Sequence, residues 1–455
     1  MRACSGSVLS MIAFVALLRA GVALANPAID DSALRTRQTK LDNGLTVLTL
    51  EDHTTPVVAF QMWVRVGSSD ESRVTGLAHL FEHMMFKGSK NLPPEKHGQI
   101  IQSRGGRLNA YTTSDVTVYT TEVPSGVLPL VIALEAERLA NLDISEENLT
   151  SEREVVLEER RMRTEDRPGG RAHEALYALT FQALPYRWPV IGWRSDIEGT
   201  TIEDCRNFFS TFYVPNNIVI AIVGDFDADA ALTQIRESFG ELAPAAEIPR
   251  HRTREPRQSG VRRAEVYFDV RAPILATAWQ TRPAGHPDNE ALDVAGEILS
   301  GGRSSRTYRR LIHDEQIALS AHGANSELAR AGIFGAYASV RPGESVDRVE
   351  ASFLDEIARL RDEPVTAEEL DKAKRQLEVS MVHGLTTNRA IASRIGYDVT
   401  ILGAIRPLED RLAAIQAVDA ADVQRVAQTY LTDEGGNVVH VVPPPDSTEK
   451  QGGDS

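Results

Sequence analysis

The stretch Gly76-Leu-Ala-His-Leu-Phe-Glu-His-Met-Met-Phe86 places two histidines and one glutamate inside an otherwise apolar run. On a helix, where successive residues lie about 100° apart, His79, Glu82 and His83 gather on one side. The apolar residues gather on another side, in a stripe that comprises Val74, Leu77, Ala78, Phe81, Met84 and Met85. The polar residues therefore leave the apolar face intact, and the two histidines lie one helical turn apart.

Two imidazoles with this spacing can hold one Zn²⁺ at about 2.0–2.1 Å each. Glu82 faces the same space, where it can take a proton from water that the metal activates. The pattern is H-x-x-E-H, the inverse of the better-known H-E-x-x-H. The alternative is a helix with an ordinary solvent-exposed polar face, which the flanking apolar residues argue against. The sequence therefore predicts a zinc site with Glu82 as the general base.

A third ligand must come from another segment, because a hydrolytic zinc site commonly has three protein ligands and one open position. The segment 146–166 is rich in acids, and the phase of the helix expected there selects among them. Its apolar stripe runs through Leu149, Val155 and Val156. Glu152 and Glu159 fall on this stripe, where carboxylates are costly unless they are paired or metal-bound. We predict Glu159 as the third ligand and Glu152 as the carboxylate that orients a histidine or the base. A buried salt bridge is the alternative for each.

The N-terminus has the order of a secretory signal peptide over residues 1–25, in which Arg2 and an apolar run precede the small residues Ala23-Leu24-Ala25. A membrane anchor is the alternative, but the apolar run is short and Arg19 interrupts it. No later segment of the sequence is long and apolar enough to span a membrane. We therefore expect an exported, soluble mature chain.

The formal net charge is −15, and it becomes −17 when the first 25 residues take Arg2 and Arg19 with them. A chain this acidic is a poor candidate for binding nucleic acid or an anionic membrane. Its charge is better explained by solubility than by attraction of basic peptides. Of the two cysteines, Cys4 lies in the predicted signal peptide, so only Cys205 remains and the mature chain has no internal disulfide.

Strand and helix patterns mix in both halves of the chain. We expect a hairpin over 41–50, strands over 57–66, 108–123, 218–223 and 437–442, and helices over 74–88, 94–103, 128–141 and 145–164. The predicted fold is α+β with two similar domains, 26–244 and 263–442, each a mixed or antiparallel sheet packed with helices. The Pro- and Arg-rich segment 245–262 predicts a linker, and the tail 443–455 is expected to be disordered.

The zinc motif, followed by Glu159 at 76 residues after His83, resembles the pitrilysin/insulinase family of zinc peptidases. The resemblance is greatest to the shorter branch, which includes mitochondrial processing peptidase and its bacterial relatives. Asn109, Ala110, Tyr111 and Thr112 resemble the family's edge strand, which binds the substrate backbone by β-augmentation. The stretches 212–217, 224–225 and 299–308 are similar to structural segments of its two domains.

The resemblance implies a zinc endopeptidase with one Zn²⁺ per chain, held by His79, His83 and Glu159. In the shorter branch two chains usually meet as a clam-shell dimer around a closed chamber, where unfolded peptides are hydrolysed. A bacterial relative with a signal peptide is expected in the periplasm.

One departure from the family concerns the second half. Active members usually carry an Arg and a Tyr, seven residues apart, that stabilise the substrate carbonyl. Ile312 and Leu319 stand at those positions, and losing such a donor typically costs about 10²–10³ in rate. Tyr308 and Arg310 lie nearby in a different helical phase, and we interpret them as ordinary helix residues. The hypothesis is that a second chain of the family supplies the Arg/Tyr pair, with a homodimer as the alternative.

Two rival functions differ in class. A non-catalytic binding or assembly subunit is one, but such chains usually lose zinc residues, whereas this chain keeps them all. A structural zinc site is the other, and it would normally be closed by a fourth protein ligand, often Cys. Cys205 is the only candidate, and it lies in a different predicted segment.

Overall fold

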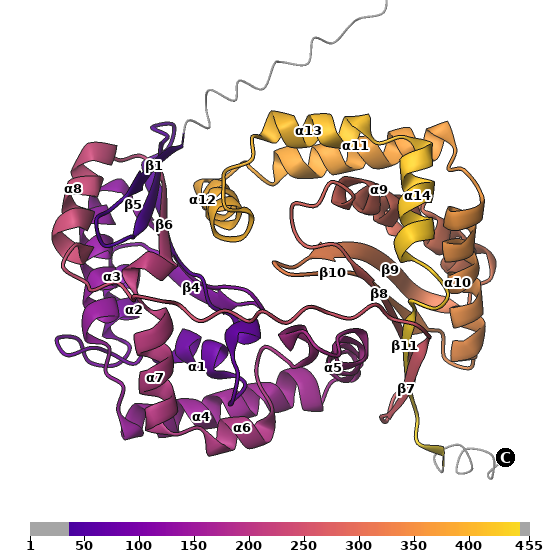
Figure 1. Ribbon diagram of the computed structural model, residues 1–455, viewed down its shortest axis with the longest axis horizontal. Helices are drawn as coiled ribbons and strands as arrows, with labels where there is room; N and C mark the ends of the chain where they lie inside the picture. Colours follow the sequence, from indigo (N-terminus) through magenta and orange to yellow (C-terminus); the bar gives the residue numbers. More distant parts are fainter. Residues whose placement is uncertain (1–35, 446–455) are drawn as a thin grey trace, which may run out of the picture. The chain divides into compact units, whose positions relative to one another are not determined.

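Two β-sheets, one in each half of the chain, organise the computed structural model, which describes residues 36–445 (Figure 1). The strands are β1 (Arg37–Lys40), β2 (Thr46–Glu51), β3 (Val57–Val64), β4 (Arg107–Thr112), β5 (Thr117–Pro124), β6 (Ile218–Gly224), β7 (Arg262–Tyr267), β8 (Ile274–Thr281), β9 (Ala318–Glu327), β10 (Gly332–Val340) and β11 (Asn437–Val442). The first sheet has the order β1-β2-β6-β3-β5-β4, and the second has the order β7-β11-β8-β10-β9.

The second sheet repeats the arrangement of the first without a counterpart of β1. β2 pairs with β6 in parallel, as β7 does with β11, and the other neighbouring strands are antiparallel. In both halves a helical segment precedes the outer hairpin, and two long helices follow it. The fold is therefore α+β with two similar halves, as the sequence predicts.

Helices cover the sheets in both halves (Figure 1). They are α1 (Leu77–Met84), α2 (Lys96–Ser103), α3 (Leu128–Asn141), α4 (Glu146–Arg160), α5 (Pro168–Thr180), α6 (Arg194–Gly199), α7 (Ile202–Phe212), α8 (Ala228–Phe239), α9 (Asn289–Ser300), α10 (Val346–Asp362), α11 (Ala367–His383), α12 (Asn388–Tyr397), α13 (Leu408–Ala417) and α14 (Ala420–Tyr430). Among residues 36–445, no helix combines the length and the apolar character that a membrane crossing requires.

Each sheet has its own apolar core, and one helix from each half packs against the sheet of the other half. The first core contains Phe60 and Phe81, and the second contains Phe334 and Phe353, all within 1% of full burial. α5, from the first half, packs against β8 and β11 of the second sheet. α12, from the second half, packs against β3 and β6 of the first. The two halves therefore share packed surfaces, and the described residues cluster as one compact unit.

Three expected elements differ from the structure. The strand expected over 108–123 is the hairpin β4–β5, because residues 113–116 turn the chain through a hydrogen bond from the Thr113 N–H to the Val116 carbonyl (2.8 Å). The helix expected over 74–88 is the shorter α1, which begins after a glycine with φ of +91°. The helix expected over 145–164 ends as an α-helix at Arg160 and continues as one π-helical turn.

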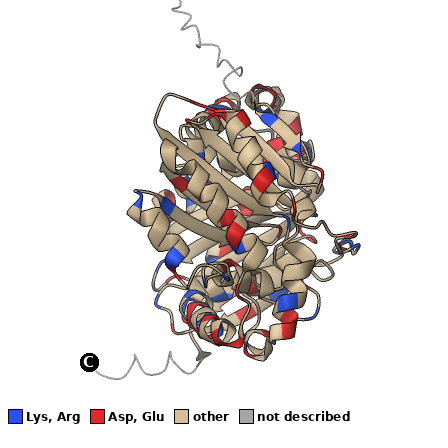
Figure 2. Ribbon diagram, turned by 90° about the vertical axis from the view of Figure 1, so that its left-hand side faces the viewer, with Lys and Arg blue, Asp and Glu red and all other residues tan. Residues whose placement is uncertain are grey.

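The segment 245–262 has no helix or strand before β7, and charged side chains fasten it to the first half. Arg250 donates to the carbonyl of Arg65 at 2.6 Å, and Glu255 accepts from the backbone N–H groups of residues 182–184. The predicted signal peptide and residues 446–455 of the predicted tail lie outside the described residues. In the view of Figure 2, acidic and basic residues are interspersed over the elements that face the reader.

Candidate metal centre

The start of α1 is fixed by a glycine and a buried carboxylate. Gly76 precedes the helix with φ of +91°, and a Cβ there would lie 2.6 Å from the carbonyl oxygen of Ile191. The carboxylate of Glu71 accepts hydrogen bonds from the backbone N–H groups of Gly76 (2.9 Å) and Ala78 (2.8 Å). Because the apolar residues of α1 pack into the first core, the helix presents its polar stripe in a defined direction.

That polar stripe meets α4 instead of forming a solvent-exposed face. His79 is only 8% exposed, and its ring centroid lies 4.9 Å from that of His83. Nε2 of His83 lies 3.3 Å from Oε2 of Glu159, and Nε2 of His79 lies 3.7 Å from Oε1 of the same carboxylate. The structure thus brings both predicted histidines and the predicted third ligand together.

These three residues fit a tetrahedral metal ion. Ligand atoms about 2.1 Å from such an ion lie about 3.4 Å apart, close to the 3.3 and 3.7 Å that separate the two imidazole nitrogens from the two oxygens of Glu159. One ligand atom from each residue lies within 4.8 Å of the others. Within the described part of the chain, Nδ1 of His79 has no hydrogen-bond partner, and Nε2 lies too far from Glu159 for a hydrogen bond. A metal bound at Nε2, the nitrogen that faces Glu159, would give this buried imidazole a partner.

Glu152 lies behind His83, 4% exposed, with Oε2 at 3.3 Å from Nδ1 of the imidazole. Its Oε1 lies 2.8 Å from Nζ of Lys87, and Arg163 contacts Glu159 at 2.6 Å. A carboxylate on the second nitrogen of a histidine ligand orients the ring. Neither Lys87 nor Arg163 is among the site residues that the sequence predicts. Each follows a site residue by four positions, and that spacing could have indicated them.

The expectation that Val155 lies on the buried stripe of α4 is wrong. Its side chain is 47% exposed, whereas Val156 is fully buried. Because adjacent residues on a helix lie about 100° apart, the two valines cannot share one narrow stripe. The buried stripe passes through Leu149, Glu152, Val156 and Arg160. Glu159 lies at its margin, where its side chain is 14% exposed and open to a ligand.

In the absence of a metal, the two histidines have very different pKa values. Burial lowers the pKa of His83, but hydrogen bonds with Glu152 and Glu159 outweigh it and raise that pKa to about 9. Burial, with the charge of His83, lowers the pKa of His79 to about 4. The contact with His83 lowers the pKa of Glu159. At neutral pH His83 is therefore protonated on both nitrogens, and the proton on Nε2, which faces Glu159, lies where a cation could bind.

Glu82 is hydrogen-bonded to the edge strand β4. The hydroxyl of Thr112, on that strand, donates to Oε2 of Glu82 at 2.7 Å. Burial raises the pKa of Glu82, which suits a group that takes and returns a proton. β4 is the outermost strand of its sheet and pairs only with β5. Along it Asn109 and Tyr111 are exposed, while Ala110 and Thr112 are half-buried. An unpaired strand edge beside Glu82 can receive an extended chain.

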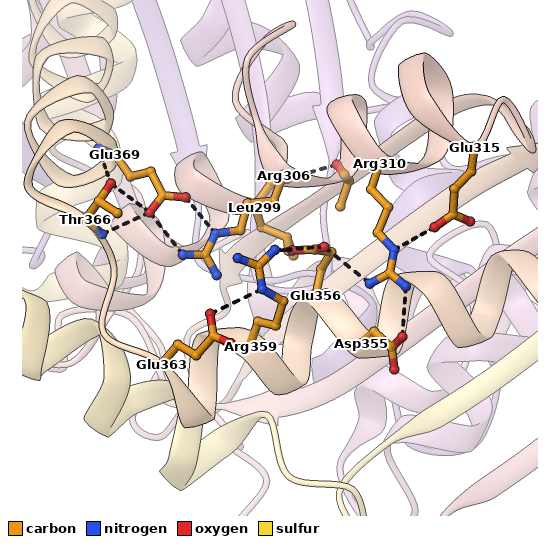
Figure 3. A network of polar contacts seen from close by, with 11 residues as sticks. Leu299, Arg306, Arg310, Glu315, Asp355, Glu356, Arg359, Glu363, Thr366 and Glu369 are labelled. Carbon is orange, nitrogen blue, oxygen red and sulfur yellow. Dashed lines mark hydrogen bonds and ion pairs between the residues drawn. The ribbon is translucent and has the colours of Figure 1, made fainter.

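In the second half, neither position of the missing Arg/Tyr pair offers a hydrogen-bond donor. Ile312 packs against the second core, and Leu319 is 52% exposed at the start of β9. Arg310 is engaged in a network of ion pairs, in which its partners are Glu315 (2.8 Å), Asp355 (2.8 Å) and Glu356 (3.3 Å) (Figure 3). Tyr308 begins a π-helical segment, Tyr308–Asp314, that contains both Arg310 and Ile312.

The described residues contain a second His/Asp/Glu group, formed by Asp347, Glu350 and His440. Nε2 of His440 lies 2.6 Å from Glu350, and both terminal nitrogens of Arg263 contact the same carboxylate. Burial opposes the charge of Glu350, but His440 and Arg263 lower its pKa to about 2. Because the guanidinium of Arg263 engages both oxygens of this carboxylate, the group is an ion-pair cluster. Cys205, buried on α7, belongs to neither group.

The chain is similar to known proteins along most of its length. Residues 46–192 match "Insulinase (Peptidase family M16)", and residues 200–377 match "Peptidase M16 inactive domain". The zinc protease PqqE of Helicobacter pylori is 29% identical over 408 residues, which cover 89% of this chain and 92% of that protein. An uncharacterized zinc protease of Streptomyces coelicolor is 31% identical over 408 residues, with 87% of each chain covered. The crystal structure of a protease from Helicobacter pylori is similar with a TM-score of 0.87 and 28% identity, covering 90% of this chain and 99% of that one.

Proposed function

Because the chain belongs to the insulinase family, peptidase family M16, we propose that it is a zinc-dependent endopeptidase that hydrolyses unfolded peptides. The observation that carries this proposal is the convergence of His79, His83 and Glu159 beside Glu82. All four residues lie in the segment that matches the insulinase description, and none lies in the segment that matches the inactive domain.

Each residue has a role that follows from its place. His79, His83 and Glu159 would hold one zinc ion, which supplies Lewis-acid chemistry by polarising the scissile carbonyl and lowering the pKa of water. Glu82 takes the proton of the attacking water and returns it to the leaving amine. The hydroxyl of Thr112 keeps the Glu82 carboxylate directed toward the reacting atoms. Strand β4 aligns the substrate backbone through its unpaired edge.

A second chain completes the site in this proposal. Ile312 and Leu319 cannot stabilise an oxyanion, and Arg310 is held by three carboxylates of its own half. We therefore place the missing Arg/Tyr pair on a related chain, in a heterodimer where this chain contributes zinc. Residues 1–25 have the sequence pattern of a signal peptide, which supports export. We therefore propose that the two chains assemble in the periplasm.

The competing proposal is a non-catalytic subunit. The match of residues 200–377 to an inactive-domain description supports this alternative. Hydrolysis of a quenched, unstructured peptide by the purified chain, with and without a chelator, separates the possibilities. Chelator-sensitive cleavage by the chain alone supports the peptidase and removes the need for a partner. Zinc bound at one equivalent without cleavage directs the search to the partner chain. A chain that binds no zinc contradicts the proposal.

A further inference from the structure

One carboxylate joins the tip of the β4–β5 hairpin to the second half of the chain. Oδ1 of Asp115 accepts a hydrogen bond from the hydroxyl of Tyr186 at 2.7 Å. Oδ2 accepts from the backbone N–H of Ala329, in the turn between β9 and β10, at 2.9 Å. Ser69 donates to Oδ1 at 3.3 Å. Asp115 thus accepts from donors in three separate segments, and one of them is the turn that joins two strands of the second sheet.

The partner hydroxyl is anchored in the second half. Tyr186 is 1% exposed and belongs to an apolar cluster that includes residues of α5, β8 and β11. Its ring packs edge-on against Phe181 at 5.3 Å, and the guanidinium of Arg330 lies 5.6 Å from its centroid. The backbone N–H of Arg330 also donates to the Tyr186 hydroxyl at 3.0 Å. This packing gives the hydroxyl a fixed position relative to the second sheet.

The same hairpin tip is tied to the segment that leads into α1. The backbone N–H groups of Ser68 and Ser69 donate to the carbonyls of Thr113 (3.2 Å) and Ser114 (2.8 Å). Arg330 donates to the carbonyl of Ser69 at 2.7 Å. Two residues later Glu71 caps the start of α1. These contacts therefore hold both elements that flank the candidate metal centre, helix α1 and the edge strand β4.

We infer that Asp115 is a positioning residue, through which the second half of the chain fixes β4 against Glu82. This inference rests on the proposed function, in which Glu82 is the general base and β4 binds the substrate backbone. Thr112, which donates to Glu82, is the last residue of β4 and lies three residues before Asp115, in the turn that follows the strand. An edge strand has a ladder of hydrogen bonds on one side only, so its end frays unless another contact holds it. The halves are then coupled, because contacts from the second half hold the strand that lies beside Glu82.

The test compares Asp115→Asn with Asp42→Asn, a matched change at an exposed position in the turn between β1 and β2 of the same sheet. Asp115→Asn removes the charge and turns one acceptor oxygen into an N–H₂ donor, which can pair with Tyr186 only if that hydroxyl accepts instead of donating. Tyr186→Phe is the second variant, because it removes the hydroxyl and keeps the packing of the ring. Hydrogen exchange is measured for residues 107–112 of the zinc-loaded chain, and kcat is measured per bound zinc in the form that cleaves peptide.

We expect exchange of residues 107–112 to become roughly tenfold faster in both variants, with kcat per zinc falling by a similar factor. Asp42→Asn should leave both quantities unchanged. Unchanged exchange in both Asp115→Asn and Tyr186→Phe overturns the inference, and so does faster exchange with full turnover per zinc. A wild-type chain that never cleaves peptide, alone or with a partner, refutes the proposed function and with it the contribution of Asp115 to catalysis. The exchange rates still report whether the contact itself holds β4.

Discussion

Replacing Glu152 with glutamine should weaken zinc binding without unfolding the chain. The carboxylate joins Nδ1 of His83 (3.3 Å) to Nζ of Lys87 (2.8 Å), and its side chain is 4% exposed. Glutamine keeps the volume, but its amide cannot accept from both partners, and Lys87 loses its buried counter-charge. Loss of such a partner typically weakens metal affinity about 10–100-fold, or about 1.4–2.7 kcal/mol.

The effect should depend on pH in a particular direction. In the metal-free chain the pKa of His83 is raised to about 9, so below that pH a proton competes with zinc for the imidazole. The affinity of the wild-type chain therefore rises as the pH approaches 9. Glu152→Gln removes one carboxylate that holds this proton, so the variant suffers less competition at pH 7. The difference in affinity between the two proteins should consequently be larger at pH 9 than at pH 7.

A competition titration against a chromophoric chelator at both pH values measures this difference. Glu154→Gln is the matched control, since Glu154 is exposed on the same helix and should leave the zinc affinity unchanged. Circular dichroism of the metal-free proteins checks that the variant is folded. Equal zinc affinities of wild type and Glu152→Gln at pH 9 would refute the assignment of Glu152 as the carboxylate that orients His83.

Two predictions concern stability. The pKa of Glu350 is lowered from 4.5 to about 2, so its charge stabilises the fold by up to about 3 kcal/mol above pH 4.5, and this contribution is lost as the pH falls toward 2. Urea unfolding should therefore show a deficit for Glu350→Gln at pH 7 that shrinks at pH 3, and a deficit independent of pH would contradict this origin. Gly76→Ala should destabilise by at least about 2 kcal/mol, because its φ is +91° and its Cβ would meet Ile191. Gly126→Ala, with nothing within 4 Å of the added Cβ, is the control, and equal unfolding midpoints would contradict the strain argument.

The parts of the site that follow helical periodicity could be predicted from the sequence. The i, i+4 spacing of His79 and His83 and the phase of Glu152 and Glu159 are local properties, and the structure brings these four residues together. The placement of Val155 was wrong because a stripe drawn through two adjacent residues is broader than a helix allows. The turn at 113–116 was missed because it contains no Gly or Pro and is closed partly by the side chain of Thr113.

Contacts between distant segments could not be predicted in the same way. The partners of Asp115 lie 71 and 214 residues away in sequence, and no local pattern selects them. The exchange of α5 and α12 between the two halves depends on how the sheets pack, which a reading of single elements does not reveal. The contact between Thr112 and Glu82 likewise depends on β4 lying beside α1.

In the proposed function, Glu82 is the general base of a zinc peptidase. The most direct test of this role is the hydrolysis of a quenched peptide by the Glu82→Gln variant, in the form in which the wild type cleaves, with bound zinc measured in the same samples. We predict one zinc per chain in both proteins and a loss of turnover of at least about 10²-fold in the variant. Turnover close to that of the wild type, with zinc retained, would show that Glu82 is not the general base.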